Sequence, residues 1–288
     1  MNAAKHPFFR HVLGQAPVMA VVRMTGAKKS LDVKLVSLLR DELAILAASQ
    51  LGYAKRHQTA APAAAGERSP TGRSQLWIDA NCTWTQPNRS FGPRGDLRLD
   101  EGWLEFQRKV LFLKLLRLLR GDVPVSKEWR QDLRRAAVLI GLSQMSTSVA
   151  DAFLSNMIAL ELLLTRQGDT VGDMLPARAE ALIGWSRHWI EDRFETKIRA
   201  AYQRRCRLVH QGDRDSPTRE DLYFTDDLLL CLLANLVAHL NIFQSKDDVR
   251  EFSYRVAAEK LLGAKPRVRP KSLQMFRRTY HAKDYEIY

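Results

Sequence analysis

The stretch STSVADAFLSNMIALELLLTRQG, Ser146 to Gly168, decides the fold class of this chain. Its large apolar residues recur every three or four positions, which places them on one face of a helix. This stripe consists of Phe153, Met157, Leu160 and Leu164. Glu161 stands among these apolar neighbours, and burying an unpaired carboxylate costs several kcal/mol. We therefore expect an arginine of a neighbouring helix to pair with Glu161, either to fix helix packing or to orient a functional arginine.

Helical periodicity continues on both sides of this stretch. The expected helices are one from Asp100 to near Gly121, one that Ser126 caps, one long or two shorter helices over 176–212 with a break near Gly184, a very apolar helix beyond Pro217, and a last helix from Asp247 to Leu262. Antiparallel helices joined by short connections form a bundle. The predicted fold class is therefore mainly α, with an antiparallel helical bundle at residues 121–245.

Residues 1–120 are predicted to form a smaller N-terminal α+β region. An amphipathic helix from Ser30 to Gly52 opens it. The stretch at about 56–75 then loses periodicity and gains Pro, Gly, Ala and Ser, which is typical of a mobile linker or a long surface loop. In LWIDANCTWT apolar and polar residues alternate, which predicts a strand.

The chain is strongly basic. Its 288 residues contain 45 Lys and Arg against 32 Asp and Glu, which gives a net charge of +13. Such an excess favours a polyanionic partner, although it also serves simple solubility. No acidic residue lies between Glu259 and Asp284. Residues 246–288 are therefore expected to form a basic helix and tail that binds a polyanion. The expected contacts there are Lys265, Arg267, Arg269 and Lys271.

The three cysteines, Cys82, Cys206 and Cys231, are odd in number and widely spaced. They indicate neither a disulfide framework nor a zinc site, so Cys206 and Cys231 are expected to be packing residues in a reducing cytoplasm. No apolar run reaches the roughly 18 residues that a membrane span needs. We therefore expect a cytoplasmic protein without a membrane partner.

The sequence lacks the phosphate loop, the HExxH motif, the GxSxG elbow and the glycine-rich dinucleotide turn. This excludes the commonest NTPase, zinc-hydrolase, esterase and Rossmann patterns. His239 lies on an apolar helix, where a lone histidine is more often a core residue than a ligand. Trp185 and Trp189 flank His188 one turn apart, and they form either packing contacts or a base-stacking platform.

The segment RRCRLVHQG, Arg204 to Gly212, places three arginines and a histidine at a helix end. Cations there complement the helix dipole, and Gly212 stops the helix, so an ordinary basic terminus explains the pattern. A phosphate-handling site is the alternative. On an ideal helix Arg205 and His210 point about 140° apart. A site that uses both therefore needs a frayed helix end or a second subunit.

The segment IRAAYQRRCRLVHQG resembles the signature of HEPN domains, in which an aromatic-led helix carries Arg, four to six residues, and then His. It is most similar to the Apea-like branch, with its "Y..R..IVH.G" form. That branch also has an upstream "ALE.LL" helix, which 159–164 matches. The resemblance covers roughly 133–243. It departs at Cys206, where the family commonly has Asn, Asp or Ser.

The resemblance implies a helical bundle that pairs into a homodimer with two Arg/His motifs facing each other. Many such domains are endoribonucleases that need neither a metal nor a cofactor, often in prokaryotic defence or toxin-like systems. The implied catalytic residues are Arg205 and His210, with Glu161 and Cys206 in support. Arg204 and Arg207 are expected to hold the flanking RNA backbone. Residues 1–120 would then sense a trigger or restrain the nuclease.

Two rival interpretations remain. In the first, the chain is a non-catalytic HEPN module that binds RNA or a nucleotide or acts as a dimerisation scaffold, and Cys206 favours this interpretation. In the second, the chain is a basic helical adaptor with an accidental likeness to HEPN domains. In the second case His210 would lie on a solvent-facing helix end without Arg205 or Glu161 nearby.

Overall fold

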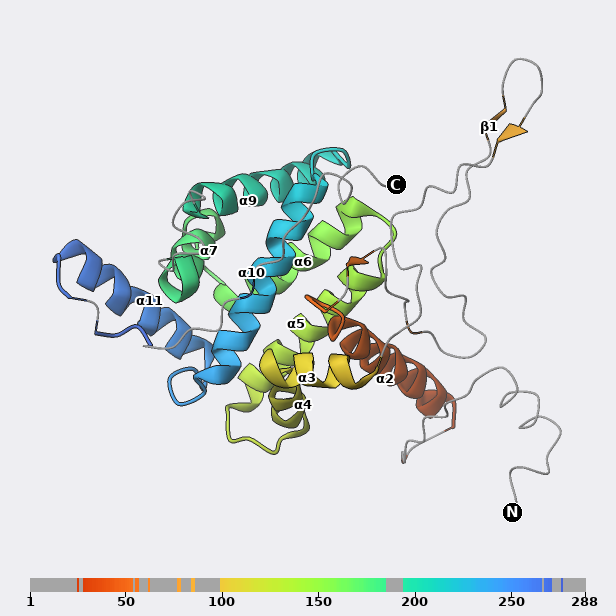
Figure 1. Cartoon of the computed structure of the whole chain (residues 1–288), viewed down its shortest axis with the longest axis horizontal. Coiled ribbons are helices and arrows are strands. Elements are labelled where there is room, and N and C mark those ends of the chain that lie inside the picture. Colours follow the sequence, from red (N-terminus) through yellow and green to blue (C-terminus); the bar gives the residue numbers. More distant parts are fainter. Residues whose placement is uncertain are drawn as a thin grey trace.

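The computed structural model describes residues 25, 28–53, 55–56, 62, 77–78, 84–85, 99–184, 194–265, 267–270 and 276. This part of the chain forms nine α-helices, one π-helix and two very short strands (Figure 1). The elements are α2 (Lys28–Ala48), β1 (Trp77–Ile78), β2 (Trp84–Thr85), α3 (Glu101–Lys109), α4 (Phe112–Arg120), α5 (Lys127–Met145), α6 (Val149–Leu164), α7 (Val171–Ala179), η3 (Glu180–Gly184), α9 (Phe194–Gln211), α10 (Arg219–Ala238) and α11 (Lys246–Leu261). The prediction of a mainly α fold built around a helical bundle is confirmed.

Helices α5, α6 and α10 cross the middle of the molecule (Figure 1). Helices α7 and α9 lie on one side of them, and α2, α3 and α4 lie on the opposite side. Only three residues separate α5 from α6, so the two run antiparallel as close neighbours. The predicted boundaries of α5, α6, α10 and α11 agree with the structure to within a few residues.

Side-chain caps fix where the central helices begin. Ser126 accepts a hydrogen bond from the Trp129 amide at the start of α5, as predicted. Ser148 caps α6 in the same way. At α10, Thr218 and Asp221 satisfy each other's backbone amides in a capping box. These side-chain oxygens supply acceptors for the first amide N–H groups of each helix, which have no intrahelical carbonyl to bond.

One continuous hydrophobic core includes residues of α2, α4, α5, α6 and α10. Helix α2 approaches α5 closely at Gly141, where an added Cβ would lie 1.7 Å from the Ala44 carbonyl oxygen. Ala44, Ile45, Ala47 and Ala48 of α2 are buried. Helix α2, which the sequence assigned to a separate N-terminal region, thus shares its core with the bundle.

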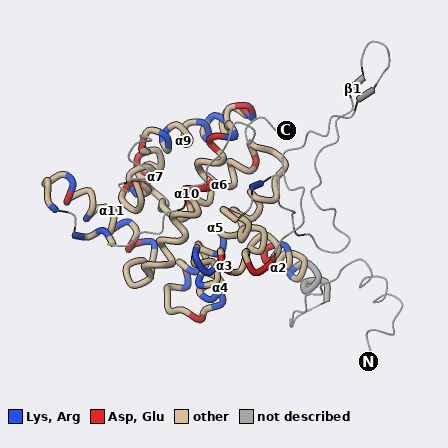
Figure 2. The backbone as a smooth tube through the Cα atoms, in the orientation of Figure 1, with Lys and Arg blue, Asp and Glu red and all other residues tan. Residues whose placement is uncertain are grey.

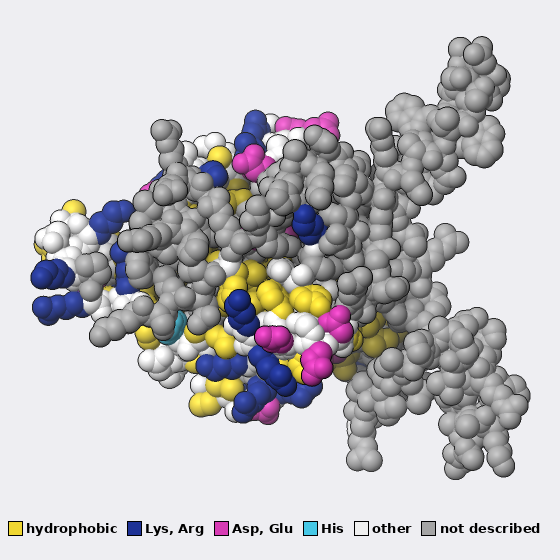
Figure 3. All heavy atoms as spheres, viewed as in Figure 1, with side chains coloured by type: hydrophobic (Ala, Val, Ile, Leu, Met, Phe, Trp, Pro, Cys, Tyr) yellow, Lys and Arg dark blue, Asp and Glu magenta, His cyan; other side chains and the backbone are white. Residues whose placement is uncertain are grey.

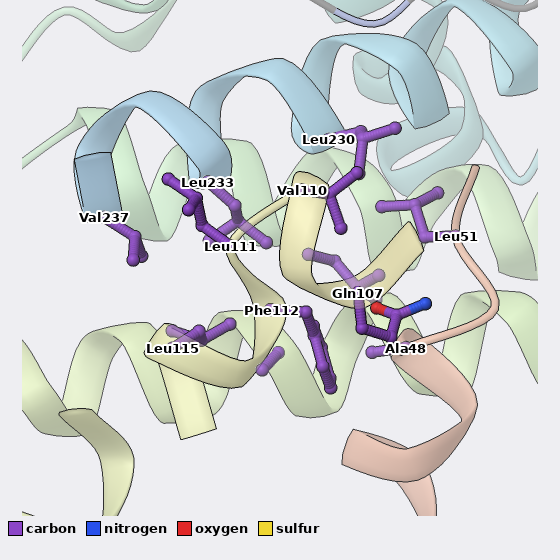
Figure 4. Close-up of a pocket in the computed structure, with 12 residues that line it drawn as sticks. Ala48, Leu51, Gln107, Val110, Leu111, Phe112, Leu115, Leu230, Leu233 and Val237 are labelled. Atoms are coloured by element: carbon purple, nitrogen blue, oxygen red, sulfur yellow. The ribbon is translucent and has the colours of Figure 1, made fainter. Parts of the chain in front are cut away.

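The expected helix from Asp100 to Gly121 is broken in the middle. Leu111 adopts a left-handed backbone with φ 61°, so α3 ends before it and α4 begins after it. The break directs Phe112 and Leu115 into the core. A small apolar cavity of about 20 Å³ remains between this corner, α2 and α10 (Figure 4). It has room for about one water molecule.

Two other expectations about elements are refined. The strand predicted in LWIDANCTWT is instead a pair of two-residue strands, because Ile78 pairs antiparallel with Trp84. The alternation did not reveal that the chain reverses direction there. Helix α7 begins at Val171, before the predicted start at 176, and the break predicted near Gly184 borders residues 185–193, which lie outside the described residues.

A buried ion pair joins the segment after α2 to the bundle. Arg56 donates from Nε to Asp226 Oδ2 at 2.8 Å and from Nη2 to Oδ1 at 2.6 Å. It also donates to the Ser143 hydroxyl at 2.8 Å, while Asn156 donates to Asp226 at 2.8 Å. Arg56 and Asp226 are 2% and 0% exposed. Arg56 is therefore a core residue, whereas almost all of the remaining loop predicted at about 56–75 lies outside the described residues.

Candidate functional site between α6 and α9

Helix α9 carries most of the residues that the sequence singled out. Its buried face contains Phe194, Ile198, Ala201 and Leu208. This face packs against α6, α7 and η3. The arginines lie at other positions around the helix, so the burial of one apolar stripe determines which cations approach the bundle and which face solvent.

Glu161 of α6 pairs with Arg205 of α9. Arg205 Nη2 donates to Glu161 Oε2 at 3.0 Å, and Nε lies 2.9 Å from Oε1 without hydrogen-bond alignment. The two side chains are 20% and 17% exposed. The partner expected for Glu161 from a neighbouring helix is thus Arg205, the same arginine that the motif resemblance selected.

Burial raises the pKa of Glu161 above its ordinary value of 4.5, although the neighbouring Arg205 acts in the opposite direction. Desolvation is therefore the stronger of the two effects. An ionised carboxylate held at such a site is less favourable than the same group in water. This makes the pair a poor contributor to stability, and perturbed groups of this kind are common at functional sites.

Tyr202 and Cys206 complete the cluster around this pair. The pKa of Tyr202 is raised, first by burial and then by a side-chain hydrogen bond with Cys206 and by the nearby Glu161. The Tyr202 ring packs over Gly172 of α7, where an added Cβ would lie 3.3 Å from the ring. Cys206 is half-buried with a free thiol. The cluster thus joins α6, α7 and α9.

Arg204 lies apart from this cluster. It forms an ion pair with Asp221, the residue that caps α10. Both residues line a groove of about 350 Å³ between α9 and α10, together with Lys197 and Phe224. Arg204 is thus already paired, whereas Arg207 on the same helix is exposed.

His210 is exposed in the last turn of α9. In the part of the chain that the structure describes, no hydrogen bond or ion pair joins it to Arg205, which faces Glu161 instead. The structure therefore unites Arg205, Glu161 and Cys206 but leaves His210 outside this cluster. The helix geometry that predicted this separation explains it. This exposed placement of His210 is also the one expected for a basic helical adaptor with an accidental likeness to HEPN domains.

The other predicted residues are distributed as follows. Lys265 and Arg267 are exposed after α11, Arg269 is half-buried, and Lys271 lies outside the described residues. Trp185, His188, Trp189 and Cys82 also lie outside them. Cys231 is buried, which raises the pKa of its thiol to about 12, and its sulfur contacts the Phe276 backbone. Half-buried His239 ends α10.

Two site residues were not selected from the sequence. Tyr202 stands three residues before Arg205, and its aromatic position in the motif was the available signal. Asp221 gave no signal of pairing with Arg204, because its capping role explains its presence. In the described segments there is no group of three or more His, Cys, Asp or Glu able to hold a metal. No helix in them is long and apolar enough to cross a membrane.

Comparisons with known proteins give no match. No protein-family model matches the chain, and no curated protein or solved structure does either. The functional assignment therefore depends on the residues themselves.

Proposed function

We propose that this chain is a metal-independent endoribonuclease of the HEPN type that acts as a homodimer. The observation that carries the proposal is the Glu161–Arg205 pair. It holds the motif arginine, which shares α9 with His210, against a desolvated carboxylate of α6. A charged pair whose burial disfavours ionisation is better explained by orientation of a functional group than by stability.

The proposed reaction uses the nucleophile that RNA itself carries. An imidazole of His210 accepts the proton of the 2′-hydroxyl as its oxygen attacks phosphorus. The bond from phosphorus to the 5′-oxygen breaks, and a second imidazole donates a proton to that oxygen. The products are a 2′,3′-cyclic phosphate and a 5′-hydroxyl. Arg205 stabilises the phosphorane charge, and Arg207 holds the adjacent backbone.

The second imidazole is proposed to come from a second copy of the chain. A two-fold symmetric interface contains the same residue from each of the two copies. Val209 and Ile158, which are 47% and 37% exposed, offer apolar surface on α9 and α6 beside the pair. Val209 is four residues from Arg205 and Ile158 is three from Glu161, spacings that place each on the same helix face as its charged neighbour.

The decisive experiment compares wild-type protein, His210→Ala and Gln211→Ala on total RNA in EDTA, followed by analysis of fragment ends. We expect fragments with cyclic-phosphate ends from wild type and from Gln211→Ala, which removes the exposed neighbour. His210→Ala should slow cleavage about 100-fold or more. Intact RNA in all three reactions, or equal cleavage by His210→Ala, contradicts the proposal.

The dimer is tested separately. Val209→Asp should yield a monomer in sedimentation experiments and lose cleavage, because a charge in an apolar interface is costly. Tyr254→Asp, at an exposed apolar position of α11, is the matched control and should leave both properties unchanged. Cleavage by a monomeric Val209→Asp protein would contradict a shared site.

A second candidate function is a non-catalytic RNA-binding module of the same type. It is favoured by the absence of any contact between Arg205 and His210 and by Cys206, whose thiol is a weak hydrogen-bonding group. This function predicts RNA binding without cleavage at any protein concentration. It also predicts that Arg207→Gln weakens binding, whereas His210→Ala leaves RNA ends unchanged.

A further inference from the structure

Helices α3 and α4 carry a group of closely spaced positive charges. Five cations lie within 13 residues there, and no acidic residue stands between Glu105 and Asp122. These cations, which we call the α3–α4 strip, are Arg108, Lys109, Lys114, Arg117 and Arg120. All are exposed except the half-buried Lys114. Figure 2 shows the basic residues along these two helices.

Several basic residues elsewhere in the described chain are neutralised by carboxylate partners. On α9, Arg199, Arg204 and Arg205 are each paired with an Asp or Glu. Arg166 and Arg214 are paired as well. For the five cations of the strip, the described residues provide no ion pair. Their charge is therefore available to an external anion.

The packing of α4 explains why these cations face outward together. Phe112, Leu115 and Leu118 turn into the core, which leaves Arg117 and Arg120 exposed and Lys114 half-buried. Lys114, Arg117 and Arg120 follow one another at three-residue spacing, which covers about 9 Å along the helix axis. The array is long enough to meet several phosphates of one strand, and a single small anion would use only part of it.

A cavity of about 240 Å³ borders the strip. Its lining includes Trp103, Leu116, Leu119 and Arg120, with Glu42 already paired to Arg134 at one side. The Trp103 indole donates to the Ser49 hydroxyl at 3.1 Å, which fixes the orientation of the ring. Figure 3 shows apolar side chains beside Lys and Arg on this face. An apolar, aromatic-lined hollow beside cations suits an unpaired base next to its own phosphate.

We propose that the α3–α4 strip and this cavity bind a single strand of nucleic acid, with its phosphates on the strip and a base in the cavity. This surface lies on the opposite side of the bundle from α9 (Figure 1). A lipid surface is a poorer fit, because α4 has turned its most apolar face into the core. Membrane-bound amphipathic helices keep that face available for the bilayer.

The probe is a fluorescein-labelled single-stranded 2′-O-methyl oligoribonucleotide, which lacks the 2′-hydroxyl needed for cleavage. Binding is followed by fluorescence anisotropy over a range of salt concentrations. The test variant R108Q/R117Q/R120Q removes three exposed charges of the strip. The matched control R135Q/R214Q/R255Q removes three exposed charges that lie near carboxylates elsewhere. Because the probe is not cleaved, the result does not depend on the proposed nuclease activity.

We expect the test variant to bind about tenfold more weakly than the control, with the slope of log affinity against log salt reduced by about 2. A duplex of the same sequence should bind more weakly than the single strand. Equal affinity of the test and control variants for the probe would show that the strip does not bind the phosphates. Equal affinity of the protein for duplex and single strand would show that no base enters the cavity. If the test variant instead loses only its binding to phosphatidylserine vesicles, the surface is a lipid contact and the proposal is wrong.

Discussion

Arg205 and Glu161 join α9 to α6 through a pair of contacts at 2.9 and 3.0 Å. The raised pKa of Glu161 means that desolvation outweighs the attraction of the arginine. Ionised Glu161 therefore costs free energy in the folded chain relative to its protonated form. The pair orients Arg205 at some expense of stability, and this leads to two predictions about unfolding.

Replacing Arg205 with alanine should destabilise the protein by about 1–3 kcal/mol at neutral pH, because it leaves a half-buried carboxylate without its partner. The loss should shrink in acid, where Glu161 takes up a proton. Urea unfolding at both pH values measures it. The double variant Arg205→Ala/Glu161→Gln should recover most of the lost stability. Arg199→Ala, an exposed arginine on the same helix, should unfold at nearly the wild-type urea concentration.

Glu161→Gln should change how stability depends on pH. Because the folded pKa of Glu161 is raised, its contribution is fully present below the ordinary value of 4.5 and is lost as pH rises through the folded pKa. The free energy of unfolding of wild type relative to Glu161→Gln should therefore fall as pH rises above 4.5. Unfolding curves at several pH values test this. Glu251→Gln, which removes an exposed charge, measures the effect of net charge alone. If this difference in the free energy of unfolding instead rises with pH, the attraction of Arg205 outweighs the burial of Glu161, and the prediction is wrong.

The buried Arg56–Asp226 pair should be essential for folding. Asp226→Asn leaves the Arg56 guanidinium buried without a counter-charge, which costs about 3–5 kcal/mol. Chemical denaturation measures the loss. The control is Glu42→Gln, which breaks the largely exposed pair with Arg134 and should cost about 1 kcal/mol or less. Equal midpoints for wild type and Asp226→Asn would show that Arg56 does not occupy the core in solution.

Gly141→Ala should separate α2 from α5. Alanine is the better helix former by about 1 kcal/mol, so propensity alone predicts a stabilised protein. The added Cβ would instead collide with the Ala44 carbonyl oxygen, and we expect a loss of about 2 kcal/mol or more. Thermal unfolding gives the sign. Leu142→Ala, at the exposed neighbouring position, should have a much smaller effect. A stabilised Gly141→Ala variant would mean that α2 does not pack closely there.

Most of the fold could be predicted because the signals that begin, continue and end a helix are local in the sequence. Ser126 and Pro217 indicated where two of the helices begin, and the stripe through Phe153 and Leu164 indicated a buried face. The break at Leu111 could not be predicted, because nothing at that position breaks a helix and only packing of Phe112 and Leu115 compensates for its left-handed backbone. The antiparallel pairing of Ile78 with Trp84 was likewise not visible in the alternation.

The candidate site was predicted only in part. The position of Glu161 in the sequence predicted a cationic partner, because an isolated carboxylate is unfavourable among apolar residues. Its choice of Arg205 rather than Arg204 depends on how α9 is rotated against α6, and that rotation is set by the burial of Ile198, Ala201 and Leu208. The same rotation leaves His210 on the solvent side.

The sequence by itself determined the helical class, most helix boundaries and the excess of positive charge, since periodicity, caps and composition are local properties. Only the tertiary structure decided which charges pair. Arg56 reaches Asp226 across 170 positions, whereas the cations of α3 and α4 have no carboxylate partner among the described residues. The physical reason is that an ion pair depends on distance in space and on burial, and both are set by how helices far apart in the chain pack together.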